Sequence, residues 1–458
     1  MSSGIAANRK RILLLCSDVV GKQMAGTAIR SVEIAKTLSF LHDVTLLAAD
    51  IGEHNFRGFK LNVGDSTLVK HLAFQSDIVI FQGDSLSRYP FLKDIEGVLI
   101  ADLYCPIPLE YHMSTQTTAN STRLDEGWRI ARMMQEQLIW ADHFLCASQR
   151  QMDFWAGALT LAGRINPLSM PSVSDSNFRH FFSVVPFGFP DELPKNRGTP
   201  IRDKFNIPRD EFLMVWGGGI YEWFDPVTIL KAVARLEIEG TRVHLVFMGI
   251  KHPNPTINPH DRVGLAVEYS RQLGVIDRLV HFNFGWVDYD VRHEYLMDAD
   301  VGVSAHLDNM ETRFSFRTRM LDYLWCGLPI LSTKGDEFGD LISARGLGVS
   351  VNYEDVDDWC LAIRQMMKPG DFFRGCKRAV SEVRAEYTWS NVTKPLQKAC
   401  VEISPSKDRA YIRLRAKEMG YINDRFRGVM ARVRSVYQRF GFWGLARAIW
   451  CKFLKTLR

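Results

Sequence analysis

The sequence contains no paired cysteines and no long hydrophobic run at its start. Its eight cysteines stand singly, without a CxxC pair or a cluster of histidines, a spacing that is typical of reduced core thiols and argues against disulfides or zinc. The apolar stretch 12–16 is too short for a signal-peptide core or a membrane span. We therefore expect a cytoplasmic protein.

Short tandem repeats and low-complexity segments are also absent. The 458 residues are 46% hydrophobic and 24% charged, which is ordinary for globular proteins and excludes disorder of the whole chain. A chain of this length has room for two or three domains with their own cores.

Charge is distributed unevenly along the chain. Residues 405–458 hold 14 Lys and Arg against 3 Asp and Glu, a local charge of +11 that leaves residues 1–404 at −6 within the total of +5. Apolar residues at helical spacing in this tail predict basic amphipathic helices that meet an anionic surface. That surface is either a membrane or nucleic acid. No nucleic-acid-reading motif accompanies the charge, so we expect no nucleic acid partner. The alternative is a helical pair that packs on the body or on a protein partner.

The first part of the chain alternates short β-branched runs with helical patterns. The expected strands are 11–17, 43–49, 76–82, 97–103 and 142–148, and the expected helices are 27–41 and 122–140. This alternation predicts a parallel sheet covered by helices on both faces.

After the Pro- and Gly-rich passage 186–211, the same pattern begins again. Strands are expected at 212–219, 243–249, 279–283, 300–305, 329–332 and 348–351, with helices from Pro226 and near 262–273. Two doubly wound α/β domains facing a cleft are therefore predicted, and their ligands should bind beyond the carboxyl ends of the strands.

Three glycines, 217–219, follow the first strand of the second part directly. Small residues here let the backbone approach a ligand, and Gly218 and Gly219 are candidate donor-binding residues. A tight strand-to-helix turn is the alternative explanation of this motif.

Three arginines gather around a predicted helix start between two strands: Arg313, Arg317 and Arg319, with Asp322 one turn later. Arginine forks suit a diphosphate, and a carboxylate suits ribose or sugar hydroxyls. The loop after the next strand adds three further candidates, Gly335, Asp336 and Glu337. The alternative is a solvated, salt-bridged helix face.

Several sequence segments together resemble glycosyltransferase family 4 of the GT-B fold. They are DYLWCGLPIL followed by TKGDEFGDLI, WGGGIYEWFDP, FGWVDYDVRHEYLMDADVGVSA, FLCASQRQMDFW and VVPFGFP. The resemblance covers about residues 10–390 and implies an acceptor-side domain at 1–190, a nucleotide-sugar domain with a final crossover helix at 191–404, and the basic tail at 405–458.

By this resemblance Asp322 holds the nucleotide ribose, and Arg317 lies near the phosphate. The family's first acid falls on Phe314, so Glu311 and Asp308 are the candidates to replace it, and we predict Glu311 as catalytic. The usual basic residues after the first strand of the second domain are absent as well. Arg319, where a divergent branch carries Lys, is expected to supply the charge together with Arg317.

The first domain contributes candidates on the opposite side of the cleft. Gly26 and Thr27 open the first helix, where the family approaches the donor phosphate, although a simple helix start also explains them. Asp102 follows a strand and is predicted as catalytic. Glu110 and His112 lie in an expected Pro-containing loop and are acceptor-side candidates, the histidine being more often structural.

The implied reaction transfers a sugar from a nucleotide diphosphate sugar to a glycan or lipid-linked acceptor, with retention of configuration, in surface polysaccharide or lipopolysaccharide synthesis. Because no DxD-like motif stands in a suitable context, we expect no metal and no cofactor. The tail would hold the protein at the inner face of a membrane. Two rivals remain: another GT-B enzyme, such as a nucleotide-sugar epimerase or a phosphorylase, and a non-catalytic GT-B binding subunit.

Overall fold

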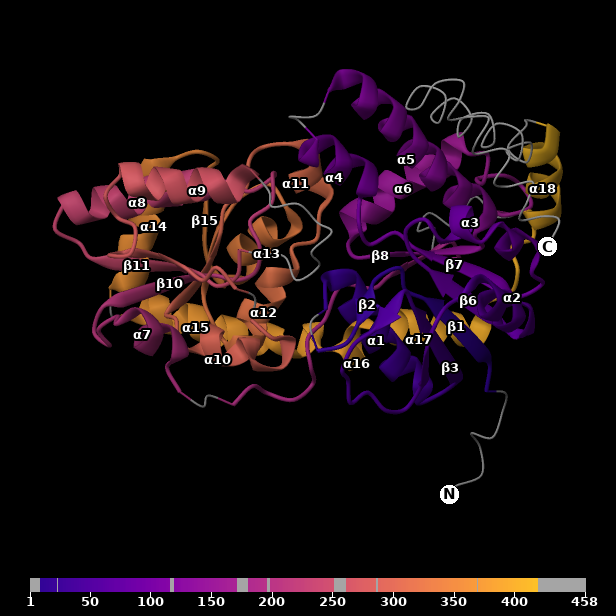
Figure 1. Ribbon diagram of the computed structural model, residues 1–458, viewed down its shortest axis with the longest axis horizontal. Helices are drawn as coiled ribbons and strands as arrows, with labels where there is room; N and C mark the ends of the chain where they lie inside the picture. The colour runs from indigo at the N-terminus through magenta and orange to yellow at the C-terminus, as the bar shows by residue number, and fades with distance from the viewer. Residues whose placement is uncertain are drawn as a thin grey trace, which may run out of the picture.

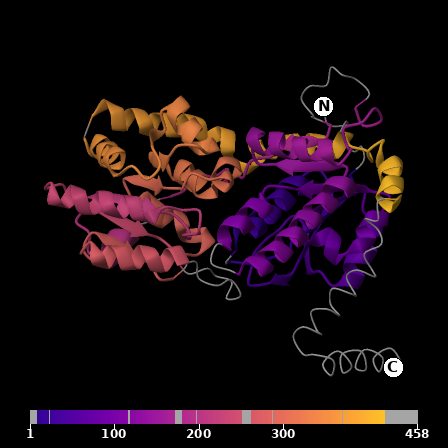
Figure 2. The ribbon, with the colours of Figure 1, turned by 90° about the horizontal axis from the view of Figure 1, so that it is seen from above.

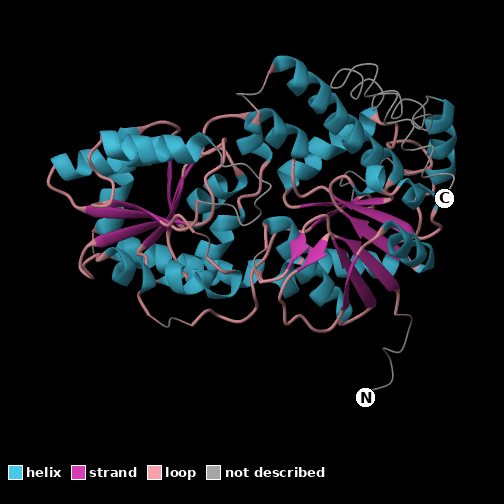
Figure 3. Cartoon of the chain, viewed as in Figure 1, coloured by secondary structure: helices cyan, strands magenta, loops and turns pink. Residues whose placement is uncertain are grey.

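The computed structural model describes residues 9–22, 24–115, 119–170, 180–195, 198–250, 261–285, 287–368 and 370–418. Two α/β halves lie side by side, each with one large parallel sheet between helices (Figures 1 and 3). The prediction of two doubly wound domains is confirmed. The predicted stripes beyond residue 418 in the basic tail lie outside the described residues.

The sheet of the N-terminal half has seven parallel strands in the order β5-β3-β1-β6-β7-β8-β9. Their bounds are β1 Arg11–Leu15, β3 Asp43–Ala48, β5 Lys60–Val63, β6 Ile78–Phe81, β7 Val98–Asp102, β8 His143–Cys146 and β9 Phe182–Val184. The apolar runs of the sequence predict all of these strands except β5 and β9. Strand β5 is mostly exposed and β9 has only three residues, so neither produces a clear apolar run.

Helices cover both faces of this sheet. On one face α1 (Gly26–Ser39) packs through Ala28, Val32 and Ala35 against Ile12 and Leu14 of β1. The opposite face carries α2 (Ser66–Gln75), α3 (Ser85–Arg88), α5 (Asn120–Trp140) and α6 (Gln149–Leu161). The short strands β2 (Val19–Val20) and β4 (Asp50–Ile51) pair separately beside the start of α1.

The C-terminal half contains six parallel strands in the order β12-β11-β10-β13-β14-β15. They are β10 Phe212–Trp216, β11 Val243–Phe247, β12 Val280–Phe282, β13 Val301–Ser304, β14 Ile330–Thr333 and β15 Gly348–Val351. All six coincide with the apolar runs of the sequence, because each is almost completely buried apart from β15.

Two helical layers enclose this second sheet. One layer contains α8 (Pro226–Ile238), α9 (Asp261–Gln272) and α14 (Val356–Met367). The other contains α7 (Pro200–Phe205), α10 (Arg292–Met297), α12 (Thr318–Cys326), α13 (Glu337–Arg345) and α15 (Asp371–Val383). Between β13 and α12 lies the short helix α11 (Met310–Phe314).

The chain crosses between the halves twice. It first leaves β9 through the PFGFP segment and later returns at α16 (Trp389–Val392) and α17 (Lys394–Glu402), which run along the N-terminal half (Figures 1 and 2). Leu396 and Cys400 join the core beneath α1. Helix α18 (Arg409–Glu418) packs on α5, and Asp408 before it accepts a 3.0 Å hydrogen bond from buried Arg164.

Seven of the eight cysteines lie in the described part of the chain, and all seven are free thiols, six of them buried. Among the described residues, no helix has the length and apolar character needed to cross a membrane.

Candidate active site

The strand order of each sheet reverses direction at one place, between β1 and β6 in the N-terminal half and between β10 and β13 in the C-terminal half. Loops diverge at such a switch point and leave a crevice beyond the carboxyl ends of the strands. Both crevices of this chain contain candidate residues from the sequence.

A pocket of about 170 Å³ lies on the seam between the halves. We call it the seam pocket. The C-terminal half lines it with 217–219, Tyr221, Met248, Gly249, Val287, Arg292, Thr318, Arg319 and Asp322. The other half contributes Met24, Ala25, Gly26 and Ile29, and the crossing segment contributes Phe187.

The three-glycine segment after β10 forms the floor of the seam pocket. The backbone N–H of Gly217 donates to the Tyr323 hydroxyl at 2.8 Å. Gly218 has a positive φ of 79°, a conformation that favours glycine. Tyr323 in turn packs on Gly302, where an added Cβ would lie 2.3 Å from its ring. These contacts hold the backbone amides of the segment at the pocket.

Arg319 lies in the pocket wall near the start of α12. Its Nη2 donates to the carbonyl of Gly219 at 2.6 Å, and its guanidinium stacks over the Phe224 ring at 4.0 Å. Nη1 is buried and has no hydrogen-bond partner among the described residues. Burial lowers the pKa of Arg319 to about 10. Arg319 is therefore a buried cation with an unused donor beside the pocket, an arrangement that suits an anionic ligand.

Asp322 lies one turn further along α12. One carboxylate oxygen accepts a 2.9 Å hydrogen bond from Arg292 Nε, and 31% of the side chain is exposed. Arg292 also lies over the Trp325 ring, 4.6 Å from its centroid. The carboxylate is thus oriented at the pocket with acceptor capacity to spare.

Arg317 and Glu311 do not line the seam pocket. They form a buried ion pair in which both Nη atoms of Arg317 donate to Glu311, at 2.8 and 2.6 Å. Ser315 also donates to Glu311. Because the Glu311 side chain has no exposed surface, it cannot contact a sugar in this arrangement. The geometry therefore favours a structural role over the predicted catalytic one, and it leaves Arg317 neutralised.

Gly335 and Asp336 directly precede α13, which begins at Glu337. Asp336 caps the helix by accepting a 2.7 Å hydrogen bond from the N–H of Gly339, and burial raises its pKa to about 6. Arg150 of α6 crosses the seam and donates to the carbonyl of Gly335 at 2.6 Å. Glu337 lies 3.8 Å from the same guanidinium. All three candidates thus lie at the seam, outside the seam pocket.

Phe314, at the position expected for an acid, is part of this same contact. Its ring packs against Phe154 of α6, with centroids 4.8 Å apart. Gln151 donates from one amide nitrogen to the carbonyls of Tyr104 and Phe314, both at 2.9 Å. Phe314 therefore joins the two halves.

A second pocket, of about 360 Å³, lies at the carboxyl ends of β1, β6 and β7. We call it the N-half pocket. Its lining consists of Ser17, Asp18, Thr27, Gln82, Gly83, Asp102, Tyr104, Cys105, Ile107 and Glu110. The two pockets adjoin at the start of α1, since Gly26 lines one and Thr27 lines the other.

Asp102 is fully engaged by hydrogen bonds. Arg30 donates to both of its oxygens, at 2.7 and 3.0 Å, and Gln82 donates at 2.9 Å. Arg30 also bonds the carbonyls of Val185 and Pro186 in the crossing segment. A carboxylate held in this way orients Arg30 more readily than it accepts a proton from a substrate. The catalytic role of Asp102 stays a prediction.

The expected loop around Glu110 and His112 is wrong, because these residues belong to α4 (Ile107–Ser114). Proline is accommodated in the first turn of a helix, where its missing N–H would have no partner anyway. Glu110 lines the N-half pocket, whereas His112 is exposed and does not. Burial, together with the neighbouring Glu311, raises the pKa of Glu110 to about 7.

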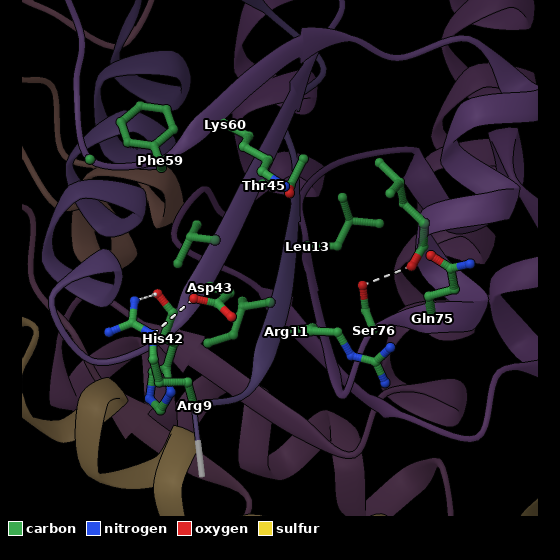
Figure 4. A pocket seen from close by; sticks show the side chains of 14 residues that line it. Arg9, Arg11, Leu13, His42, Asp43, Thr45, Phe59, Lys60, Gln75 and Ser76 are labelled. Carbon is green, nitrogen blue, oxygen red and sulfur yellow. Dashed lines mark hydrogen bonds and ion pairs between the residues drawn. The ribbon is translucent and has the colours of Figure 1, made fainter. Parts of the chain in front are cut away.

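A larger groove of about 680 Å³ lies elsewhere, at the amino ends of β1, β3 and β5 (Figure 4). Its charged side chains are largely paired, Arg9 with Asp43 at 2.8 Å and Arg11 with Asp77 at 3.4 Å. Ligands of doubly wound sheets bind at the opposite edge. The two adjoining pockets are therefore the candidate active site.

Among the described residues, no three His, Cys, Asp or Glu side chains gather closely enough to hold a metal ion. The sequence did not single out Arg30, Asp18, Gln82 or Arg292, all of which contact candidate residues. Arg30 lies within the predicted first helix, but no local pattern distinguishes it from a surface arginine.

No protein-family model matches the sequence, and no curated protein matches it either. Solved structures do share its architecture. Anabaena Alr3699/HepE in complex with UDP is 13% identical, with a TM-score of 0.58 over 86% of this chain and 100% of that chain. WaaG, a glycosyltransferase involved in lipopolysaccharide biosynthesis, is 14% identical, with a TM-score of 0.54 over 85% of this chain and 99% of that chain.

An α,α-trehalose-phosphate synthase (UDP-forming) from Burkholderia xenovorans, in complex with glucose-6-phosphate, is 13% identical. Its TM-score is 0.58 over 85% of this chain and 99% of that chain. At such identities the likeness establishes the fold alone. The chain has the GT-B fold of two Rossmann-like domains facing each other.

Proposed function

We propose that this protein is a glycosyltransferase that moves a sugar from a nucleotide diphosphate sugar to a hydroxyl of a glycan or lipid-linked acceptor. One observation carries the proposal: the seam pocket and the N-half pocket adjoin at Gly26 and Thr27. Two substrates, one in each pocket, would meet at the start of α1.

The seam pocket suits the donor. The unused N–H of Arg319 and the backbone amides of Gly218 and Gly219 provide positive charge and hydrogen-bond donors for a diphosphate. Gly26 at the first turn of the 14-residue helix α1 adds the positive end of a helix dipole. Asp322, held by Arg292, would accept hydrogen bonds from ribose hydroxyls.

The chemistry follows from where negative charge develops. Breaking the glycosidic bond leaves charge on the diphosphate while the sugar becomes oxocarbenium-like, so fixed donors at the diphosphate lower the barrier most. Arg319 and the amides at the start of α1 would supply this stabilisation. We propose retention of configuration, with the leaving phosphate assisting removal of the acceptor proton, and no metal or cofactor.

We assign Asp102 and Glu311 positioning roles. Asp102 fixes Arg30 against the crossing segment, and Glu311 fixes Arg317 behind the seam pocket. Glu311 also lies near Glu110, as the raised pKa of Glu110 indicates. The known neighbours in fold support this general function, since HepE is seen with UDP and WaaG acts in lipopolysaccharide biosynthesis.

Asp322→Asn tests the donor site. A neutral amide cannot accept from Arg292 and ribose as the carboxylate does, so we expect nucleotide-sugar affinity to fall at least tenfold, or about 1.4 kcal/mol. Calorimetric titration with UDP-, GDP- and other nucleotide sugars, followed by assays of hydrolysis and transfer, measures this. Asp357→Asn, whose side chain is 72% exposed on the far helix α14, is the matched control. Equal affinity in both variants would remove the seam pocket as the donor site.

A non-catalytic binding subunit is the second candidate. The observation in its favour is Phe314, which stands where the resembled family has an acid and instead packs against Phe154. Nucleotide-sugar binding without hydrolysis or transfer in the same assays would favour this candidate.

We also propose that the protein works at the cytoplasmic face of a membrane, in surface polysaccharide or lipopolysaccharide synthesis. The support is the charge of +11 over residues 405–458. In a flotation assay the full chain should rise with vesicles that contain anionic lipid. The chain truncated after residue 418 should stay unbound. Equal flotation of the two would contradict this role of the tail.

A further inference from the structure

The N-half pocket carries charge of one sign only. It is lined by three carboxylates, Asp18, Asp102 and Glu110, and the described residues of its lining include no Lys, Arg or His. The remaining polar groups, such as Thr27 and Gln82, are uncharged. A pocket of this composition can exchange hydrogen bonds with hydroxyls but has no cation for an anionic ligand.

Arg30, the cation that pairs with the lining residue Asp102, is unavailable to a ligand. Its side chain has no exposed surface, and all three of its nitrogens donate to Asp102, Val185 or Pro186. Arg30 and Asp102 therefore cancel each other's charge. Asp18 and Glu110 remain as carboxyl groups of the lining that no cation of the lining pairs with.

Asp18 faces the pocket from the loop after β1. It accepts hydrogen bonds from the Thr27 hydroxyl at 3.0 Å and from the N–H of Val19 at 2.8 Å. Both partners are neutral. Neutral donors bring no positive charge to offset that of a carboxylate, so Asp18 would repel an anion entering the same 360 Å³.

Glu110 lines the pocket from α4. No described residue donates a hydrogen bond to it, so its oxygens are available to a ligand. Its neighbour across the seam is Glu311, a second carboxylate, and burial together with this neighbour raises the pKa of Glu110 to about 7. Near neutral pH Glu110 thus both accepts and donates hydrogen bonds, which matches sugar hydroxyls.

We infer that the N-half pocket selects an uncharged, hydroxyl-rich acceptor sugar and rejects the same sugar when it carries a phosphate. This inference rests on the proposed function, since it specifies the acceptor of that reaction. The trehalose-phosphate synthase that shares the fold is seen with glucose-6-phosphate, so the fold itself does not impose this choice. The selection arises from this chain's own carboxylates.

The experiment compares matched sugars on the full chain with nucleotide diphosphate present. Free hexoses and N-acetylhexosamines are titrated beside their 6-phosphates by calorimetry, and transfer is assayed in parallel. We expect each free sugar to bind at least tenfold more tightly than its phosphate. The double variant Asp18→Asn, Glu110→Gln should reduce this ratio to less than threefold, because it removes the repelling charges and keeps the volume.

Glu126→Gln on α5, an exposed carboxylate paired with Arg129, is the control and should leave the ratio unchanged. Phosphorylated sugars that bind as well as free sugars, or a donor-bound protein that binds neither, would overturn the inference alone. Failure to bind any nucleotide sugar would instead overturn the proposed function. The two failures are therefore distinguishable.

Discussion

The wall of the seam pocket and the interior directly behind it each contain an arginine from the start of α12, yet their surroundings differ. Arg317 is held by the carboxylate of Glu311 through two short hydrogen bonds. Arg319, two residues later, meets only a carbonyl and aromatic rings. Each arginine keeps one buried nitrogen without a hydrogen-bond partner among the described residues, Nε of Arg317 and Nη1 of Arg319, but only Arg319 lacks a carboxylate partner and lines the pocket. Closely spaced cations can thus serve opposite purposes: one stabilises the fold, while the other is available to a ligand.

The largest effect should come from breaking the ion pair behind the wall. Glu311→Ala leaves the Arg317 guanidinium buried without its counter-charge, which should lower the free energy of unfolding by about 3–5 kcal/mol. Urea unfolding measures it. Asp371→Ala removes the partner of Arg374, a pair whose side chains are 99% and 64% exposed, and should cost less than about 1 kcal/mol. If the two variants lost similar amounts of unfolding free energy, the Glu311–Arg317 pair would contribute no more to stability than an exposed ion pair.

Asp336 is buried near the same ion pair, and its pKa depends on whether Arg317 is neutralised. Burial raises it to about 6 even though Arg317 lies near, since Glu311 already neutralises that arginine. The unfolded carboxyl ionises near its ordinary value of 3.8. The folded state therefore binds the proton more tightly, and stability that is present below pH 4 is lost as the pH rises to about 6.

Asp336→Asn keeps a helix-capping oxygen and removes this titration. We expect the wild-type protein to lose about 2 kcal/mol relative to the variant between pH 4 and 6, out of a total of about 3 kcal/mol that follows from about 1.4 kcal/mol per unit of pKa difference. Unfolding curves at several pH values provide the comparison. Parallel pH profiles for the two proteins would show that Asp336 is ionised at its ordinary value.

The smallest of these effects is expected for Arg319, the arginine that has no carboxylate partner. Arg319→Ala should weaken nucleotide-sugar binding at least tenfold, about 1.4 kcal/mol, because the diphosphate loses a charge-assisted donor. Calorimetric titration measures it, and thermal unfolding checks that the variant is folded. Arg313→Ala, an exposed arginine of α11, should change affinity less than twofold. If Arg313→Ala weakened binding as much as Arg319→Ala, ligand binding would not distinguish the two positions.

Much of the fold could be predicted because the buried strands of parallel sheets are continuous apolar runs. Five of the six strands of the C-terminal half have this character, as FLMVW of β10 illustrates, and GVSV of β15 is half-buried but still apolar enough to be predicted. The strand β5 could not be found in this way, because KLNV lies at a sheet edge and is mostly exposed. Pro108 suggested a loop around Glu110, although proline in a first turn is compatible with the helix observed.

The candidate site could be predicted only in part. Gly26, 217–219, Arg319 and Asp322 do meet at one pocket, as their places after strands and at helix starts indicate. Arg30 and its bond to Asp102 could not be foreseen, since 72 residues separate them. Local sequence contains no information about which distant carboxylate an arginine will meet.

The sequence by itself determined the two doubly wound sheets, their order along the chain and the loops from which ligands would be bound, because hydrophobic period and turn residues act over short distances. Only the tertiary structure decided which charges remain available. Glu311 neutralises Arg317, Arg30 neutralises Asp102, and Asp18 and Glu110 are left facing a pocket without a cation. The physical reason is that charge neutralisation depends on proximity in space, which the packing of the two halves establishes.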